Sequence, residues 1–327
     1  MINRRTVAEL EALFNSSLNK QSFSGYPKEL YDPFNYILQL TGKRIRPIML
    51  LMACELFGKA AEEAISQAIA IELFHNFTLI HDDIMDRAPL RRGHSTVHQK
   101  YTETSALLSG DAMLVYAYRY LVNVNSSQLA LVISLFNECA IKVCEGQQMD
   151  MNFESAQVIK AEEYLRMIKL KTATLLASSL KLGAIIGNAL LADADHLYNF
   201  GLELGIAFQL RDDWLDSFGE TQKVGKQKGG DIIQNKKTFL FVESLNIADE
   251  HTRQSLLQLY SEQQRNSEEK IKAVLSIFYD LNIEKTTEKK MQNHFEAALQ
   301  HLQFVNIGDN EKKYLNGLAH DLIRRDK

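Results

Sequence analysis

The sequence predicts an all-α protein, a single large bundle of about 10–13 helices. The 327-residue chain holds four prolines, Pro27, Pro33, Pro47 and Pro89, so none follows residue 89. Proline breaks helix interiors. The long tract after Pro89, rich in Ala, Leu, Glu, Lys and Gln, is therefore typical of consecutive helices. Strand-like alternation with hairpin turns is missing.

The spacing of apolar residues predicts helices along the whole chain. The longest early helix, at 60–87, would extend roughly 40 Å at about 1.5 Å per residue. No Gly/Ser-rich or Pro-rich linker interrupts the chain, so residues 1–327 are expected to form one domain around a shared core. The expected helices are 3–18, 28–41, 46–57, 60–87, 105–123, 127–150, 160–188, 193–219, 237–246, 250–262, 266–281, 284–303 and 310–325.

Composition excludes several classes of protein. The net charge is −4, from 37 basic and 41 acidic side chains, which argues against a general nucleic-acid binder. The N-terminus resembles no signal peptide, and no run of 18 apolar residues that could span a membrane occurs. The three cysteines, Cys54, Cys139 and Cys144, form no disulfide pattern, so a reducing, cytoplasmic location is expected.

Two acidic motifs with the same spacing stand far apart in the chain, at residues 82–86 and 212–216. Each follows an apolar helical segment. Positions i and i+4 share a helix face, so Asp82 lies beside Asp86, and Asp212 beside Asp216. Paired carboxylates at a helix C-terminus are electrostatically unfavourable. Hard oxygen ligands suit Mg²⁺, which keeps several waters and bridges to substrate phosphates. The sequence therefore predicts Mg²⁺ at both motifs.

A stripe at helical spacing leads into the second motif: Gly201, Gly205, Gln209, Asp213 and Asp216. A glycine inside a helix costs about 1 kcal/mol relative to alanine. The two glycines indicate that space is needed on this face, either for a ligand or for a neighbouring helix.

Basic residues accompany both acidic motifs. They occur at 43–46, at 87–92, at Lys171 and as five lysines within 223–237. Arginine binds phosphate with bidentate geometry and lysine binds it as a point charge. Neither a GxxxxGK[ST] loop nor a strand-linked GxGxxG occurs, so the polyphosphate is expected not to be a nucleotide. Apolar side chains before residue 82, among them Phe74 and Phe77, would line a channel for a hydrocarbon tail or simply form core.

Taken together, these motifs closely resemble those of the trans-isoprenyl diphosphate synthases, or polyprenyl synthetases. The matching stations run in order along nearly the whole chain: 42–47, 82–93, 110–111, 146–150, 171–172, 208–216, 225–226 and 231–236. The resemblance implies the isoprenoid synthase fold, with its central substrate cavity. It also implies a homodimer that condenses isopentenyl diphosphate with an allylic diphosphate.

The resemblance also implies a role for each matching position. Asp82 and Asp86 would ligate two Mg²⁺ ions and Asp212 a third, which Asp216 reaches through water. The remaining positions would bind the two substrates: isopentenyl diphosphate at Lys43, Arg46, His75 and Arg92; allylic diphosphate at Arg91, Lys171, Lys226 and Lys236; Thr172 and Gln209 beside the allylic carbon; Phe208 near the isopentenyl group; and a basic C-terminus that closes over the site.

Two residues before the first motif are expected to set product length. In the family, an aromatic ring five positions before the motif stops the growing chain, and here that residue is Phe77. Thr78, the next residue, is small. The barrier at the end of the substrate channel, here called the floor, would therefore be a single aromatic ring. This pattern resembles geranylgeranyl diphosphate synthases most, with farnesyl diphosphate synthases as the close alternative and longer products less favoured. Phe77 could instead be only core.

Other classes of protein fit less well. A di-iron bundle needs two Glu-x-x-His elements, and only Glu72–His75 supplies one. A terpene cyclase would not need the second diphosphate site at Lys43, Arg46 and Arg92. A non-catalytic subunit of a heteromeric synthase would be expected to lack one aspartate motif. His94 and His98 have i,i+4 spacing but no HExxH glutamate, which argues against zinc.

Overall fold

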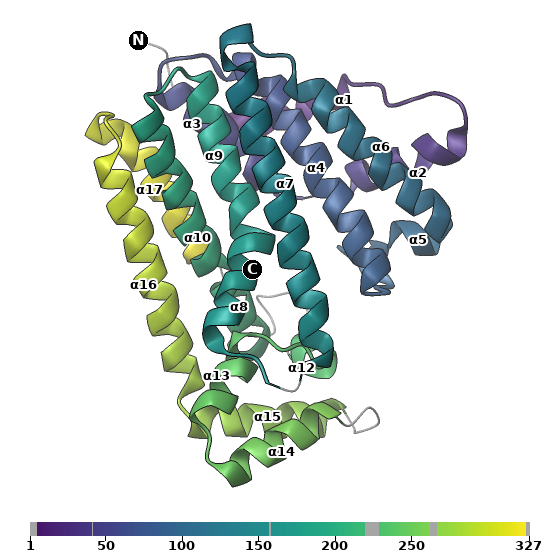
Figure 1. The fold of residues 1–327 in the computed structure, drawn as a ribbon, viewed down its shortest axis with the longest axis vertical. Helices are drawn as coiled ribbons and strands as arrows, with labels where there is room; N and C mark the ends of the chain where they lie inside the picture. The colour runs from purple at the N-terminus through teal and green to yellow at the C-terminus, as the bar shows by residue number, and fades with distance from the viewer. Residues whose placement is uncertain (1–4, 41, 157, 220–228, 262–266, 325–327) are drawn as a thin grey trace. The chain divides into compact units, whose positions relative to one another are not determined.

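The computed structural model describes residues 5–40, 42–156, 158–219, 229–261 and 267–324, and these residues are almost entirely helical (Figure 1). The all-α prediction is confirmed. The chain divides into two compact units, Met1–Glu138 with Ser178–Tyr198, and Cys139–Ala177 with Asn199–Lys327. Helices α7 (Ser126–Ser155), α9 (Thr174–Ile186) and α10 (Leu191–Phe218) contribute residues to both.

The first unit is built around α4 and α6, which pack side by side (Figure 1). Apolar residues occupy most of α3 and α4, so both helices are buried. At Gly183 of α9 a Cβ atom would collide with the Leu50 carbonyl of α3, so this glycine allows close helix packing. The elements are α1 (Val7–Asn19), α2 (Lys28–Gln39), α3 (Ile45–Leu56), η1 (Ala61–Ala64), α4 (Ile65–Met85), β1 (Leu90–Arg91), β2 (His94–Ser95), α5 (Val97–Lys100) and α6 (Glu103–Leu121).

The second unit contains the C-terminal helices, in which α14 and α15 lie side by side (Figure 1). Phe241, Phe278 and Phe295 are buried among them. Its elements, besides parts of α7, α9 and α10, are α8 (Ala161–Ile168), the π-helical η2 (Lys169–Ala173), α12 (Gly230–Ile233), α13 (Phe239–Ile247), α14 (Glu250–Ser261), α15 (Ser267–Asp280), α16 (Ile283–Phe304) and α17 (Asp309–Ile323).

Two of the expected continuous helices are interrupted. The 60–87 segment begins with a 3₁₀ turn, and α4 proper has 21 residues, about 32 Å at about 1.5 Å per residue. The 160–188 segment changes to a π-helix at Lys169–Ala173, between α8 and α9. Such π segments often mark functional sites, and this one carries Lys171 and Thr172.

The expectation that no hairpin occurs is wrong. Leu90 pairs with Ser95 and Arg91 with His94 in a two-residue-loop hairpin. The loop residues Arg92 and Gly93 both have positive φ, 54° and 78°. Paired positive φ values suit the tight turns that match strand twist. Strands of two residues are too short to produce a detectable alternation in the sequence.

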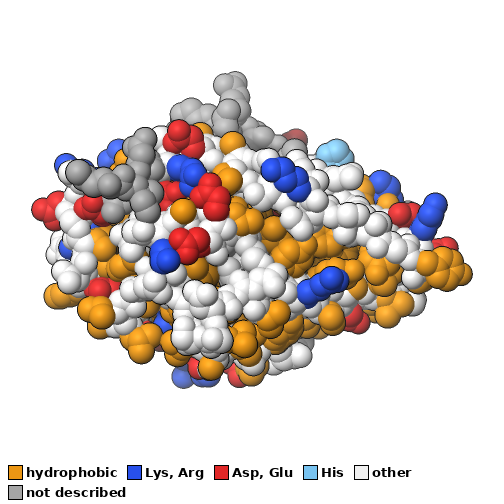
Figure 2. Space-filling view, turned by 90° about the horizontal axis from the view of Figure 1, so that it is seen from above, with side chains coloured by type: hydrophobic (Ala, Val, Ile, Leu, Met, Phe, Trp, Pro, Cys, Tyr) orange, Lys and Arg blue, Asp and Glu red, His pale blue; other side chains and the backbone are white. Residues whose placement is uncertain are grey.

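Some apolar side chains reach the surface. Figure 2 shows hydrophobic side chains gathered over part of one face of the molecule. On α6, Leu108 is 55% exposed and Val115 68% exposed. No helix among the described residues combines the length and apolarity needed to cross a bilayer.

Candidate active site

The first aspartate motif lies at the C-terminus of α4. Asp86 caps the helix, and its N–H donates to the Asp82 carbonyl at 2.8 Å. Asp86 is exposed and Asp82 is partly exposed, whereas Asp83 is buried. Two carboxylates, one turn apart, therefore remain at the surface.

Asp83 binds Arg91 of β1. The Arg91 guanidinium donates from Nε to both carboxylate oxygens, at 2.9 and 2.8 Å, and its Nη2 lies 2.7 Å from Oδ1. The same Nη2 is 3.6 Å from Asp82 Oδ2. Burial raises the pKa of Asp83, and the Arg91 charge opposes that rise. Arg91 is thus held at the motif by the aspartate that does not face solvent.

Arg92 lies at the hairpin turn, in the left-handed region that L side chains rarely adopt. Its Nη1 donates to the Leu40 carbonyl at 3.3 Å. A Cβ at Gly42 would come within 2.6 Å of that nitrogen. Gly42 therefore leaves room for the Arg92 guanidinium at the start of the basic 42–47 segment, where Lys43 is exposed.

Arg46 and His75 meet nearby, with Arg46 Nη1 3.3 Å from His75 Nε2. Burial and the charges of Arg46 and Arg92 hold the pKa of His75 well below its usual range. His75 is consequently neutral, and its Nε2 can accept from Arg46. The guanidinium groups of Arg46 and Arg92, with the neutral His75 in contact with Arg46, form a site suited to a diphosphate.

Glu72 belongs to a separate buried pair. Its carboxylate pairs with Arg44 and accepts from Asn76 Nδ2 at 2.9 Å. Because the Glu72 carboxylate is bound to Arg44 and Asn76, it is not available as a metal ligand, which argues against the di-iron alternative.

The second motif lies near the C-terminus of α10, in the second unit. Like the first motif, it contains both exposed and buried aspartates. Asp212 is exposed, and Asp213 is buried. Tyr164 donates to Asp213 Oδ2 at 2.6 Å, and Gln209 Nε2 donates to Oδ1 at 3.0 Å. Burial, together with the charge of Asp231, raises the pKa of Asp213 to about 7. Asp213, which is outside the proposed ligand set, is thus bound to Tyr164 and Gln209, as Asp83 is bound to Arg91.

Lys171 and Thr172 project from the π-helical segment. Lys171 Nζ lies 2.6 Å from Asp150 Oδ2 of α7, and Thr172 Oγ1 donates to Gln209 Oε1 at 3.3 Å. At Gly146 of α7 a Cβ would collide with the Lys171 backbone nitrogen. This glycine therefore allows α7 to approach the π-helix closely.

The glycine stripe on α10 serves helix packing at Gly205. A Cβ there would lie 2.6 Å from Ala173 Cα in the π-helix. Of the two alternatives, the structure favours the neighbouring helix at this position. Further along the stripe, Asp216 Oδ2 accepts the Asp231 N–H at 3.0 Å, and Lys236 lies 3.9 Å from Asp231 Oδ1.

The carboxylates suit Mg²⁺ as partial ligands. Within the described residues, no three His, Cys, Asp or Glu side chains converge on a preformed metal site. Mg²⁺ is commonly held by one or two carboxylates, with water and substrate phosphate in the remaining positions. Asp82 with Asp86, and Asp212 with Asp216, fit that pattern.

Other predicted site residues lie as follows. Phe208 is half-buried on α10. Phe77 is half-buried, with its ring 5.6 Å from that of Phe74 and 4.7 Å from that of His81. Thr78 Oγ1 donates to the His75 carbonyl at 2.8 Å. Lys226 and the last basic residues of the chain are outside the described residues.

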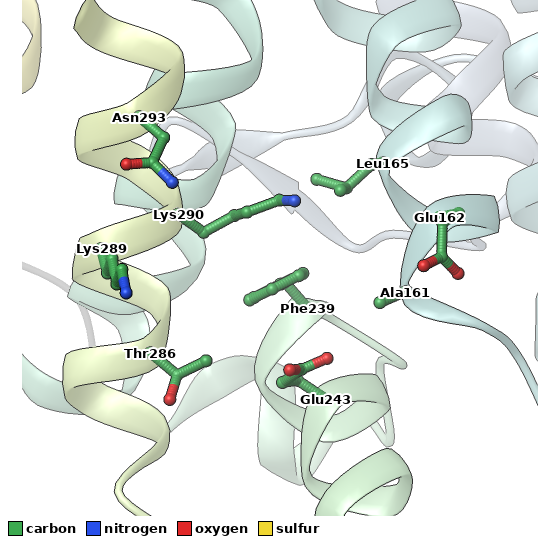
Figure 3. Close-up of a pocket in the computed structure, with 9 residues that line it drawn as sticks. All are labelled: Ala161, Glu162, Leu165, Phe239, Glu243, Thr286, Lys289, Lys290 and Asn293. Atoms are coloured by element: carbon green, nitrogen blue, oxygen red, sulfur yellow. The ribbon is translucent and has the colours of Figure 1, made fainter.

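A separate pocket of about 240 Å³ lies between α8, α13 and α16 (Figure 3). Leu165 and Phe239 form its apolar walls, and Lys290 extends into it. None of the predicted site residues lines this pocket. Its Phe239 wall connects to the site, because the Phe239 N–H contacts Asp213 Oδ2 at 3.4 Å.

Tyr164 was not predicted as a site residue from the sequence. A tyrosine at a buried helical position carries no motif of its own, so only its contact with Asp213 reveals it. Asp150 belongs to the 146–150 segment that resembles a family motif, but the sequence did not predict its pairing with Lys171.

Several known proteins are similar to this chain in sequence and fold. Residues 27–278 match the polyprenyl synthetase family. The chain is 35% identical to a geranylgeranyl diphosphate synthase of Sulfolobus acidocaldarius over 94% of both chains. It is 34% identical to a geranylfarnesyl diphosphate synthase of Natronomonas pharaonis, covering 72% of this chain and 74% of that one. A crystal structure of a geranylgeranyl pyrophosphate synthase superposes with a TM-score of 0.94 at 38% identity, over 99% of this chain and 100% of that chain.

The chain belongs to the polyprenyl synthetase family, and its fold is the isoprenoid synthase fold. It is a trans-prenyltransferase of the geranylgeranyl diphosphate synthase type, an enzyme of isoprenoid biosynthesis that makes short-chain prenyl diphosphates with a divalent metal.

Proposed function

We propose that this enzyme makes geranylgeranyl diphosphate from isopentenyl diphosphate and an allylic diphosphate, with farnesyl diphosphate as the second candidate. The packing of Phe77 carries this proposal. Its ring lies five residues before Asp82, about 7.5 Å along the helix at about 1.5 Å per residue. Contacts with Phe74 and His81 hold the ring in place. A single fixed ring at this depth favours a short product.

The two substrates have separate diphosphate sites in this proposal. Lys43, Arg46, His75 and Arg92 bind isopentenyl diphosphate, which the Arg46–His75 contact supports. The allylic diphosphate binds Arg91, Lys171, Lys226 and Lys236. Asp82 and Asp86 would hold two Mg²⁺ ions and Asp212 a third, with Asp216 as a further carboxylate beside it. When bound, these ions supply positive charge that stabilises the leaving diphosphate.

The chain's own dipoles act on the carbon centre. The allylic carbon–oxygen bond breaks, and its electron pair leaves with the diphosphate. The Gln209 amide oxygen and the Thr172 hydroxyl stabilise the allylic cation, and apolar walls exclude water that would quench it. The isopentenyl double bond then attacks this carbon, and the released diphosphate accepts the proton that is lost.

The proposed assembly is a homodimer in the cytoplasm. Leu108 and Val115 are exposed apolar residues on one face of α6, and such residues favour a protein partner. Cys54, Cys139 and Cys144 are free thiols, as expected in a reducing compartment.

Chromatographic sizing of products tests the proposal. The purified protein would be incubated with isopentenyl diphosphate and, in turn, dimethylallyl, geranyl or farnesyl diphosphate, with Mg²⁺ or with excess chelator. We expect geranylgeranyl diphosphate from each primer, and no product with chelator. A product that ends at farnesyl, or one longer than geranylgeranyl, would overturn the assignment of product length. Absence of any condensation would overturn the function.

A further inference from the structure

Four buried or half-buried side chains form a continuous hydrogen-bonded chain in the second unit. Tyr164 donates to Asp213 Oδ2 at 2.6 Å, Gln209 Nε2 donates to Asp213 Oδ1 at 3.0 Å, and Thr172 Oγ1 donates to Gln209 Oε1 at 3.3 Å. Only Thr172 and Gln209 have a proposed role beside the reacting carbon. Tyr164, on α8, lies at the opposite end of this hydrogen-bonded chain, and it is only 4% exposed.

We propose that Tyr164 is a positioning residue: through Asp213, its hydroxyl fixes which end of the Gln209 amide faces the allylic carbon. This inference rests on the proposed function. It assigns to Tyr164 no contact with substrate.

Hydrogen-bond chemistry supplies the reason. The two ends of a glutamine amide have nearly the same shape, but only the oxygen end stabilises a developing cation. In the structure both carboxylate oxygens of Asp213 act as acceptors, Oδ1 from Gln209 Nε2 and Oδ2 from the Tyr164 hydroxyl. Asp213 Oδ1 therefore selects the NH₂ end of Gln209, which leaves Oε1 on the Thr172 side.

Asp213 can select in this way only if its carboxylate is held still. Tyr164 binds the other oxygen, Oδ2, at the short distance typical of a charge-assisted bond. The Phe239 N–H also contacts Oδ2, but at 3.4 Å and therefore more weakly. Without the Tyr164 hydroxyl, Oδ2 would lose the closer of its two donors among the described residues, and the carboxylate could rotate away from Gln209.

Tyr164→Phe tests this role, because it keeps the ring and removes only the hydroxyl. Loss of a partner that orients a metal ligand commonly lowers metal affinity or activity by roughly 10- to 100-fold, and Tyr164 orients Gln209 through a contact of the same kind. We expect kcat to fall about tenfold or more, with KM for both diphosphates unchanged. A purely structural role would lower the amount of folded protein and leave kcat per folded molecule unchanged.

Tyr120→Phe is the matched control. Tyr120 is half-buried on α6, and its hydroxyl donates to Gln21 Oε1 at 2.8 Å in the other unit. This variant also loses one tyrosine hydrogen bond, and its kcat should stay at the wild-type value.

A double-mutant cycle with Gln209→Met separates action through Gln209 from independent action. In the Gln209→Met background there is no amide to orient, so Tyr164→Phe should lower kcat no further. The inference is overturned if Tyr164→Phe keeps wild-type kcat, or if it lowers kcat by its full factor in the Gln209→Met background. Failure of the proposed function is distinguishable, because the wild-type protein would then form no prenyl product.

Discussion

Arg91 binds Asp83 through two of its nitrogens, Nε and Nη2, with the closest approaches at 2.8 and 2.7 Å. This pair joins β1 of the hairpin to the last turn of α4. Asp83 is 1% exposed, while the Arg91 side chain keeps 24% of its surface exposed. The middle aspartate of the motif therefore fixes a cation beside Asp82, which is one of the proposed metal ligands.

Removal of Asp83 should destabilise the protein. Breaking a buried ion pair costs roughly 3–5 kcal/mol because the remaining charge loses its partner. For Asp83→Ala we expect a loss near the lower end, about 3 kcal/mol, since Arg91 can be partly hydrated. Chemical denaturation measures this loss. Glu63→Ala, which breaks the exposed Lys59–Glu63 pair, should cost less than about 1 kcal/mol. Equal losses in the two variants would contradict the prediction.

Substitution of a proposed metal ligand should abolish turnover without unfolding the protein. Each ion supplies several kcal/mol of charge stabilisation in the transition state, and about 1.36 kcal/mol corresponds to tenfold in rate. Asp82→Ala and Asp212→Ala should therefore lower kcat by orders of magnitude while circular dichroism stays near wild type. Asp195→Ala, an exposed position on α10, should remain active. Near-normal turnover of either ligand variant would refute the metal assignment.

The two diphosphate sites should respond to different substitutions. Arg92→Ala should raise KM mainly for isopentenyl diphosphate, and Lys226→Ala mainly for the allylic substrate. A hydrogen bond to a charged group contributes roughly 1.5–3 kcal/mol, so a rise of about ten- to a hundredfold is expected. Steady-state kinetics with each substrate varied in turn gives both constants. If each variant weakens both substrates equally, the partition is wrong.

Phe77→Ala should lengthen the products. Removal of the ring opens space below the growing tail, while the residues of both diphosphate sites are unchanged. The variant should also lose stability, but less than the roughly 3–5 kcal/mol of a fully buried Phe→Ala change, because the Phe77 ring is half-buried. Phe14→Ala in α1, where the ring is fully buried, controls for lost stability and should give wild-type products. An unchanged product distribution from folded Phe77→Ala would show that Phe77 is not the floor.

Acidification should weaken the fold through His75. Its pKa in the folded state is depressed below the usual value of 6.5 by burial and by Arg46. The unfolded chain therefore binds a proton that the folded protein does not, so stability is retained above pH 6.5 and falls as the pH drops below it. The slope should approach about 1.36 kcal/mol per pH unit.

Denaturation midpoints between pH 8 and 5 test the His75 prediction. His75→Gln should flatten this pH dependence, whereas His94→Gln, at an exposed position of β2, should leave it unchanged. A wild-type slope in His75→Gln would assign the acid sensitivity to other groups.

Sequence by itself determined the helices, the two aspartate motifs and the family. Apolar periodicity over long segments is a local property, so the expected ranges agree with the observed helices within a few residues at most boundaries. Motif spacing fixed which carboxylates share a helix face. Local patterns did not reveal the hairpin at 90–95, because its strands are two residues long.

Tertiary structure alone decided the roles of the middle aspartates and their partners. The i,i+4 spacing leaves Asp83 and Asp213 out of the paired carboxylates but does not say what they contact, and folding buries both. Arg91 then pairs with Asp83, and Tyr164 with Gln209 binds Asp213. Only Arg91 and Gln209 had been assigned to the site from the sequence. Tyr164 is 49 residues from Asp213 along the chain. No local periodicity encodes a contact of that span, because it depends on how α8 and α10 pack together.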